Sequence, residues 1–390
     1  MEQFSGARKM NKWMMWFSLL SALLVSNSLI AEADDFSLKA DTAFNPVIKQ
    51  YDLPGLVVGV TKNGDHKFFT SGLASRADNR PVTPDTLFEI GSISKVFTVT
   101  LAALAEERGI LNLKNSAAHY LCSDACALGD NLTLMDLATH HSGGLPLNAP
   151  DNISDVNSVV NWLKGWHPPQ PGTRSYSNVS IGILGYITGK AMGSNYAKAA
   201  QTVLFPAFGL NNTWIQVPQK QMGQYAFGYD KETNEPIRLE SAVLDAEAYG
   251  LKSSARDMLK ILDIELGRGQ ASDELRKAVK RTQEGQYKTA LFTQDLIWEQ
   301  YQWPASQQSM MSGNGFNFAL KPQPVEKITP PLPPQKDVII NKTGSTKGFG
   351  GYIAFVPSKG IGIVVLANKN YPSEARVKAT YSLIEALLLE

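Results

Sequence analysis

Residues 88–95 read FEIGSISK and lead into the apolar run VFTVTLAALAEERG, which ends at Gly109. The apolar pattern predicts a buried helix from Ser92 to Gly109. Ser92 lies in its first turn, where unpaired backbone N–H groups favour negative charge. Lys95 follows one turn later on the same face. Because a serine hydroxyl is a poor nucleophile until a nearby base takes its proton, this pair indicates covalent catalysis by Ser92.

Two further motifs lie downstream. Tyr176-Ser177-Asn178 follows the turn-rich segment PPQPG at 168–172, and Lys342-Thr343-Gly344 ends a Val-Ile-Ile strand. Ser-x-x-Lys and Tyr-x-Asn each occur by chance about once or twice in a chain of this length, and Lys-Thr-Gly in roughly a tenth of such chains. Their order and context therefore carry the inference. A serine nucleophile, two proton carriers and a cationic anchor together imply acyl transfer.

At these motifs the chain resembles the penicillin-recognising serine enzymes, and among them it is most similar to class C β-lactamases, whose middle motif is Tyr-x-Asn. The similarity continues, in the family's order, through residues 87–89, 137–139, 142–147, 244–250 and 366–369, so it covers the chain from about residue 40 to its C-terminus. Four places depart from the family pattern and bear on substrate preference: His140-His141, Asn148, Lys347 and Ser373.

The resemblance assigns roles to the candidate site residues. Ser92 is the nucleophile, and the sequence leaves open whether Lys95 or Tyr176 takes its proton, because coupled groups titrate together. The backbone N–H groups of Ser92 and Ser345 are expected to form the oxyanion hole. The expected substrate-binding residues are Asn148 and Asn178 for amide groups, Lys342 and Thr343 for a carboxylate, Asn368 and Arg376 for an extended positive region, and Tyr249 for a side-chain wall. Each of these residues also has a simpler interpretation when it is considered alone. The two asparagines could be turn formers, Arg376 could be a solvated charge on a helix, and Tyr249 could be an ordinary packing residue.

Residues 1–33 have the pattern of an export signal. Arg8, Lys9 and Lys12 precede the apolar stretch 13–25, and Ala-Glu-Ala at 31–33 offers small residues for cleavage after Ala33. The alternative, a membrane anchor, is disfavoured because the apolar stretch is too short to span a bilayer. We therefore expect a periplasmic protein without a stable membrane anchor. The mature chain carries balanced charge, which gives no reason to expect a nucleic-acid partner.

Cys122 and Cys126 are the only cysteines. In an oxidising periplasm they can close a small disulfide loop, or they can remain two buried thiols. Two cysteines are too few for a structural zinc site, and the adjacent His140 and His141 point in different directions, which suits a helix end or loop better than a metal. The sequence has no H-x-x-x-H pair, phosphate-binding Gly-Lys motif or Rossmann fingerprint, so no metal and no cofactor are expected.

With 390 residues, 43% of them apolar, the chain is long enough for a large core in one or two domains. The pattern predicts a helix at 40–51, a hairpin turning at Asn63-Gly64, a helix-rich segment at 111–204, an extended Pro-rich connector at 322–334, three strands between 338 and 366, and a final helix from Glu374. We expect an α/β fold of the α+β type, in which one antiparallel sheet with flanking helices is built from residues 34–110 and 205–390. A helix-rich lobe, residues 111–204, is inserted, and the active site lies in the cleft between them.

The leading hypothesis is a periplasmic serine β-lactamase that hydrolyses cephalosporins and penicillins through a Ser92 acyl-enzyme released by water. Three alternatives share the acylation step: a D-alanyl-D-alanine carboxypeptidase or penicillin-binding protein, a serine carboxylesterase, and a non-catalytic penicillin sensor. Lys342-Thr343-Gly344 argues against the esterase, and the breadth of the class C resemblance favours the hydrolase. The expected partner is a small β-lactam, and a monomer is the default because nothing in the pattern compels assembly.

Overall fold

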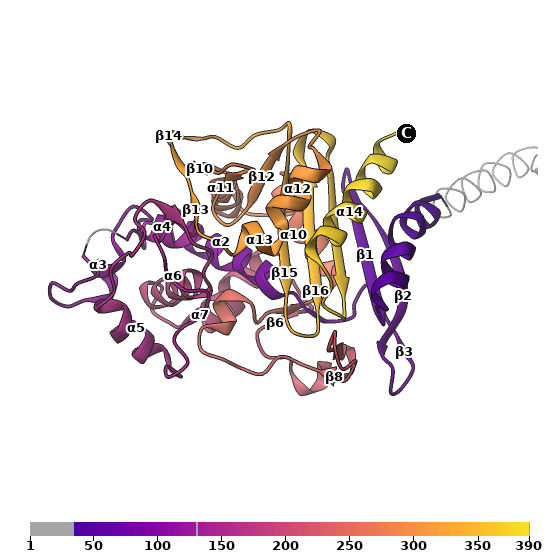
Figure 1. Ribbon diagram of the computed structural model, residues 1–390, viewed down its shortest axis with the longest axis horizontal. Coiled ribbons are helices and arrows are strands. Elements are labelled where there is room, and N and C mark those ends of the chain that lie inside the picture. The colour runs from indigo at the N-terminus through magenta and orange to yellow at the C-terminus, as the bar shows by residue number, and fades with distance from the viewer. Residues whose placement is uncertain (1–34, 130–131, 390) are drawn as a thin grey trace, which may run out of the picture.

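The computed structural model describes residues 35–129 and 132–389 (Figure 1). The predicted export signal and its cleavage point after Ala33 lie outside these residues. In Figure 1 the helices α3–α7 gather on one side of the molecule, and the strands β1, β15 and β16 with helix α14 lie on the other. This arrangement agrees with the predicted α+β fold.

One antiparallel sheet of ten strands organises the fold, in the order β14-β10-β11-β12-β15-β16-β17-β1-β2-β3. The strands are β1 (Gly55–Lys62), β2 (Asp65–Ser75), β3 (Arg80–Pro81), β10 (Gly285–Lys288), β11 (Thr293–Gln294), β12 (Glu299–Gln302), β14 (Glu326–Leu332), β15 (Val338–Ser345), β16 (Gly350–Val356) and β17 (Ile361–Ala367). Asn63 and Gly64 both have positive φ, as the predicted two-residue hairpin turn requires. Leu56 pairs with Ala367, so the first hairpin and the last strands lie side by side, as predicted.

Short strands and helices fill the rest of the described chain. The remaining strands are β4 (Phe88–Glu89), β5 (Thr173–Arg174), β6 (Thr213–Trp214), β7 (Gly228–Tyr229), β8 (Pro236–Ile237), β9 (Lys252–Ser253) and β13 (Gln323–Pro324). The helices span 35–51, α2 (Ser94–Glu107), α3 (Ala117–Leu121), α4 (Leu134–Ala138), α5 (Val156–Lys164), α6 (Asn178–Ala191), α7 (Tyr196–Ala199), α8 (Phe205–Ala207), α9 (Asp245–Ala248), α10 (Ala255–Glu265), α11 (Asp273–Thr282), α12 (Gln307–Asn314), α13 (Phe316–Ala319) and α14 (Ser373–Leu388), with single turns η1 (Gly91–Ile93), η2 (Ala200–Leu204), η3 (Gln219–Gln224) and η4 (Pro357–Lys359).

Both faces of the sheet are buried. On β1, Val57 joins a core shared with α2, α6 and α10, whereas Leu56 and Val58 join a second core shared with the helix at 35–51 and with α14. This alternation follows from the two-residue period of a strand. The first core is continuous from the sheet into the helix-rich part, and so fixes α2, which follows Ser92, against α6, which follows Tyr176. The proposed division into two domains stays a prediction.

The Pro-rich segment differs from the expected connector. Residues 326–332 form β14, which pairs with β10 at the edge of the sheet. Proline is tolerated there because an edge strand leaves one row of its backbone N–H positions unpaired. Strands β10–β12 were not predicted, since runs of two to four residues are too short to show a period.

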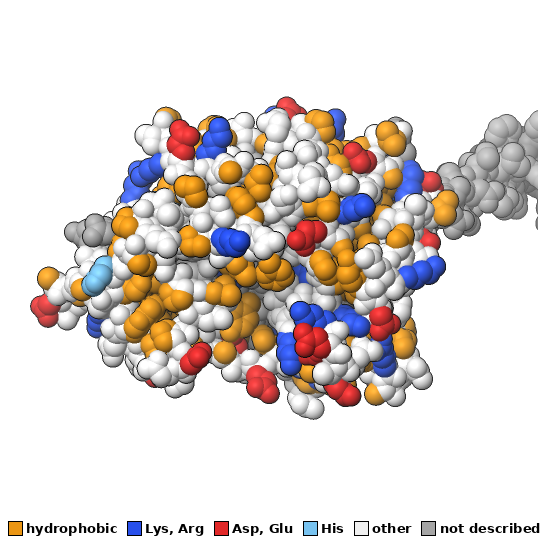
Figure 2. Space-filling view, viewed as in Figure 1, with side chains coloured by type: hydrophobic (Ala, Val, Ile, Leu, Met, Phe, Trp, Pro, Cys, Tyr) orange, Lys and Arg blue, Asp and Glu red, His pale blue; other side chains and the backbone are white. Residues whose placement is uncertain are grey.

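Other expectations concern the surface and the cysteines. Cys122 and Cys126 are joined by a disulfide, which decides between the two states that the sequence left open. Figure 2 shows Lys and Arg side chains interspersed with Asp and Glu side chains over the visible face, in line with the balanced charge. No helix in the described part of the chain is long and apolar enough to cross a bilayer.

Candidate active site

Ser92 lies on the turn η1, directly before α2, and its side chain is half-buried. The turn contacts the end of β15, and two glycines make this possible. A Cβ atom on Gly91 would collide with the backbone of Ser345, and one on Gly344 would collide with the carbonyl oxygen of Ile90. Gly91 also has a φ of 53°, a region that favours glycine. The two backbones therefore approach closely enough to place Ser92 beside the Lys-Thr-Gly motif.

Lys95 is fully buried, and its Nζ atom donates hydrogen bonds to three oxygens. These are Ser92 Oγ at 3.0 Å, Asn178 Oδ1 at 2.7 Å and the carbonyl of Ala248 at 2.8 Å. Burial lowers the pKa of Lys95 to about 8, with a further lowering from the charge of Lys342 and an opposing effect from Tyr176. A minor fraction of Lys95 is consequently neutral near pH 7, and that fraction can accept a proton.

Tyr176 is surrounded by positive charge. Its ring centroid lies 5.1 Å from Lys95 Nζ, 5.2 Å from Lys342 Nζ and 5.7 Å from the guanidinium of Arg174. Lys342 Nζ also donates to the phenol oxygen at 3.4 Å. Burial alone would raise the pKa of Tyr176, but the charges of Lys342 and Lys95 and a hydrogen bond with Ser92 lower it to about 8. The predicted nucleophile and both predicted proton carriers are thus brought together.

Asn178 and Asn148 meet at the start of α6. Ser177 caps this helix by accepting from the backbone N–H of Ser180, and Asn178 Nδ2 donates to Asn148 Oδ1 at 2.8 Å. Both asparagines line a pocket of about 260 Å³ together with the half-buried Tyr249. The pocket adjoins the reacting centre because Asn178 also contacts Lys95. The three residues therefore line one pocket next to the reacting centre, and their roles in substrate binding stay predictions.

The end of β15 presents Lys342, Thr343 and Ser345. Arg376, from α14, is fully buried and donates to Ser345 Oγ at 3.0 Å and to the carbonyl of Gly344 at 2.8 Å. Burial lowers the pKa of Arg376 to about 10, which still leaves the guanidinium charged at neutral pH. Arg376 is therefore not a solvated helix charge: it supports the strand end from within the protein.

Asn368 is a correction. Its side chain is fully buried, and its Nδ2 atom donates to the carbonyls of Leu73 at 3.0 Å and Phe227 at 2.9 Å. It ties β2 to the segment before β7, so the predicted role in substrate binding is wrong. Asn370, two residues later, contacts the residue that supports the end of β15: its Oδ1 atom accepts a hydrogen bond from Arg376 at 2.6 Å.

Lys347, one of the departures from the family pattern, lies at the surface. Its side chain is 78% exposed and pairs with Asp230 at 3.1 Å.

Comparison with known proteins agrees with this geometry. The β-lactamase family model matches residues 28–388. This chain belongs to the β-lactamase family. A β-lactamase structure from Sulfitobacter sp. EE-36 is 56% identical, with a TM-score of 0.90 over 92% of this chain and 99% of that one. A class C β-lactamase structure from Rhodobacter sphaeroides is 60% identical, with a TM-score of 0.87 over 90% of this chain and 99% of that one. A curated β-lactamase from Pseudomonas fluorescens is 40% identical over 91% of this chain and 99% of its own length. The chain is a class C β-lactamase, a serine hydrolase that acts on β-lactams.

Two residues beside Tyr176, Arg174 and His140, were not among the candidate site residues predicted from the sequence, although His140 does lie at a helix end as expected. Arg174 is buried beside Tyr176 and donates to Gln294 Oε1 at 2.7 Å and Glu299 Oε1 at 3.3 Å. Its position two residues before Tyr176 was the available signal, because alternate residues of an extended segment share a side. The imidazole of His140 contacts the Tyr176 ring, with 4.3 Å between centroids. His141 instead pairs with Asp136 and stacks on Tyr287, so the two histidines do point apart.

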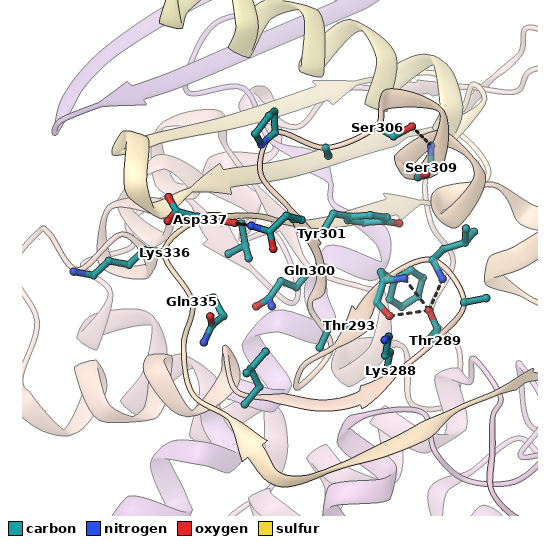
Figure 3. A pocket seen from close by; sticks show the side chains of 18 of the residues that line it. Lys288, Thr289, Thr293, Gln300, Tyr301, Ser306, Ser309, Gln335, Lys336 and Asp337 are labelled. Carbon is teal, nitrogen blue, oxygen red and sulfur yellow. Dashed lines mark hydrogen bonds between the residues drawn. The ribbon is translucent and has the colours of Figure 1, made fainter.

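Two larger hollows of the β-lactamase lie away from this pocket. Figure 3 shows a groove of about 870 Å³ whose lining includes Gln300, Tyr301 and Lys336. Another, of about 960 Å³, runs between the helix at 35–51 and α14. None of the predicted catalytic residues lines either groove, so hydrogen-bond geometry rather than size identifies the reacting centre. Among residues 35–129 and 132–389, no group of three His, Cys, Asp or Glu side chains could hold a metal ion.

Proposed function

We propose that this class C β-lactamase acts in the periplasm and that Ser92, Lys95 and Tyr176 carry its chemistry. The observation that supports this assignment is the contact of 3.0 Å between Lys95 Nζ and Ser92 Oγ, within hydrogen-bonding range for proton transfer. In acylation, Ser92 Oγ attacks the lactam carbonyl while its proton passes to the Lys95–Tyr176 pair. The C–N bond of the ring then breaks, and the proton moves to the departing nitrogen.

The negative charge on the attacked carbonyl oxygen requires preorganised donors. We assign this role to the backbone N–H groups of Ser92 and Ser345, which lie on the two segments brought into contact by Gly91 and Gly344. Arg376 would hold Ser345 in place through its hydrogen bond to the hydroxyl. Lys342 and Thr343 would bind the substrate carboxylate, since they stand at the same strand end.

Deacylation requires a water molecule to attack the ester on Ser92. Tyr176 is suited to take its proton, because a phenol whose pKa is lowered to about 8 is partly ionised near neutral pH. The pocket formed by Asn148, Asn178 and Tyr249 would receive the acyl side chain, with the asparagine amides offering donors and acceptors to its carbonyl and N–H groups. This arrangement suits both penicillins and cephalosporins.

The test follows product and protein together. The mature chain is incubated with a chromogenic cephalosporin while absorbance reports ring opening and mass spectrometry reports the protein. Continuous product release with a short-lived adduct on Ser92 is expected, and Ser92→Ala should abolish both. An adduct that persists without turnover would contradict the assignment of water activation to Tyr176 and would indicate a carboxypeptidase-like or sensor-like site. Cell fractionation and the N-terminal mass test export, with the mature protein expected in the periplasm and starting at Asp34.

A further inference from the structure

His140 has a left-handed backbone conformation, which is uncommon for residues other than glycine. It follows the C-terminal cap of α4, Thr139, and has a φ of 59°. Left-handed backbone is common at this position after a helix, but usually for glycine or asparagine. A histidine held there while fully buried points to a use for its side chain, because strained residues cluster at functional sites.

The residue contacts the chain on both sides of Tyr176. Its carbonyl oxygen accepts from the backbone N–H of Ser175 at 2.7 Å, and its Nδ1 atom accepts from the backbone N–H of Ser177 at 3.2 Å. The ring of His140 rests against the ring of Tyr176 between these two bonds, at 4.3 Å and 44°. One residue thereby fixes the backbone before and after the phenol as well as the phenol ring itself.

The hydrogen bonds also define the state of the imidazole. A nitrogen that accepts from an amide N–H has no proton of its own, so the ring proton of neutral His140 is on Nε2. Burial lowers the pKa of His140 well below its ordinary value, and the charges of Arg174, Lys95 and Lys342 lower it further. The Nε2 atom is buried and has no hydrogen-bond partner among the described residues. The lone pair on Nδ1 is therefore the polar group that His140 uses.

We propose that His140 is a positioning residue, whose Nδ1 lone pair holds the Ser177 N–H and thereby keeps the Tyr176 phenol within reach of Ser92. The proposal rests on the catalytic role given to Tyr176 above.

Two substitutions separate the acceptor from the ring. His140→Phe keeps an aromatic ring against Tyr176 but removes the acceptor. His140→Asn removes the ring, tolerates left-handed backbone and can present Oδ1 near the place of Nδ1. Since small misplacements of reacting groups can lower rates about a hundredfold, His140→Phe should lower kcat by about ten- to a hundredfold with little change in KM, and His140→Asn should recover most of that loss.

The pH profile of the reaction would not change if His140 had only a structural role. Tyr176 faces Lys95 on α2, Lys342 on β15, Arg174 on β5, and the carboxylate of Glu299 on β12. A phenol displaced from the lysines loses their stabilisation of its anion. The acid limb of kcat/KM should therefore move to higher pH in His140→Phe and stay in place in His140→Asn.

The controls are His141→Phe, Tyr176→Phe and the melting temperature of each variant. His141→Phe changes the neighbouring imidazole, which faces Asp136 and Tyr287, and should leave the profile unchanged. The proposal is overturned if His140→Phe keeps the wild-type kcat and acid limb, or if folded His140→Phe and His140→Asn lose kcat equally. If Tyr176→Phe itself keeps the wild-type rate, the failure lies instead with the role proposed for Tyr176.

Discussion

Replacing Lys342 by glutamine should convert the activity of this enzyme into one that requires alkaline pH. The substitution removes a charge that lies 3.4 Å from the phenol oxygen of Tyr176 and 5.2 Å from its ring centre. Lys342 is the largest of the influences that lower the pKa of Tyr176, and burial opposes it. Without that charge, burial is balanced only by Lys95 and Ser92, so the pKa of Tyr176 should return toward its ordinary value of 10.0 or above.

The expected magnitude follows from the size of this shift. A return from a pKa of about 8 to about 10 lowers the tyrosinate fraction near neutrality about a hundredfold, equivalent to ~2.7 kcal/mol. Because the base acts in its deprotonated form, the rate rises with pH through the pKa, and the acid limb of kcat should shift upward by about two pH units. The assay is kcat for a chromogenic cephalosporin from about pH 6 to pH 10, at saturating substrate.

Saturation matters because Lys342 is also assigned to the substrate carboxylate, and loss of that contact raises KM. Lys347→Gln is the matched control: it removes a lysine from the same segment, but one that is 78% exposed and paired with Asp230. Its pH profile should superimpose on that of the wild type. If Lys342→Gln raises KM while its kcat profile also superimposes on the wild type, Lys342 is a carboxylate anchor only, and the electrostatic reasoning is refuted.

Three further outcomes are expected. Gly344→Ala should abolish most activity and lower the free energy of unfolding by about 1–3 kcal/mol, because the new Cβ atom collides with the carbonyl of Ile90. Steady-state kinetics measure the first effect and denaturant unfolding the second. Wild-type kinetics would contradict the close approach of the two backbones. Removing the disulfide by Cys122→Ser with Cys126→Ser should lower the melting temperature only slightly and leave kcat/KM unchanged, since the bridge closes a short loop; a lost activity would show that the bridge supports the site. The acid limb of kcat should lie at higher pH than that of kcat/KM, because a bound substrate carboxylate offsets the charge of Lys342 and so raises the pKa of Tyr176; coincident limbs for an anionic substrate would argue against this coupling.

The sequence was most informative where a local residue pattern is compatible with only one kind of secondary structure. The Asn-Gly pair at 63–64 is typical of a hairpin turn, and the helix after Ser92 and the three strands from Val338 have clear apolar patterns. The structure contains each of these elements. Motif order placed Ser92, Lys95, Tyr176 and Lys342 in one site, and the contacts of Lys95 and Lys342 unite them.

The failures have a different physical origin. Asn368 was assigned to the substrate because it lies in a segment, residues 366–369, that resembles the family, but its side chain fills a buried position between two backbone carbonyls. Strand β14 was missed because its prolines suit an edge that only the assembled sheet defines. The contacts of His140 and Arg174 were not predicted because they cross the fold to Ser177, Gln294 and Glu299, and no local sequence period indicates such contacts.

The balance of charge around Tyr176 explains why His140 and Arg174 matter. Lys95, Lys342 and Arg174 all lie within 6 Å of one phenol ring, and three buried cations would repel each other strongly if nothing offset them. The buried Glu299 offsets Arg174 and part of the charge of Lys342, and His140 adds no charge because it is held neutral. The charge of Lys95 and the rest of the charge of Lys342 remain, and the tyrosinate and the carboxylate of an incoming substrate can offset them. The same excess charge therefore ionises the base in the free enzyme and attracts an anionic substrate. When that substrate arrives, its carboxylate shares Lys342 with the phenolate, which strengthens Tyr176 as a base at the stage when a proton must be taken.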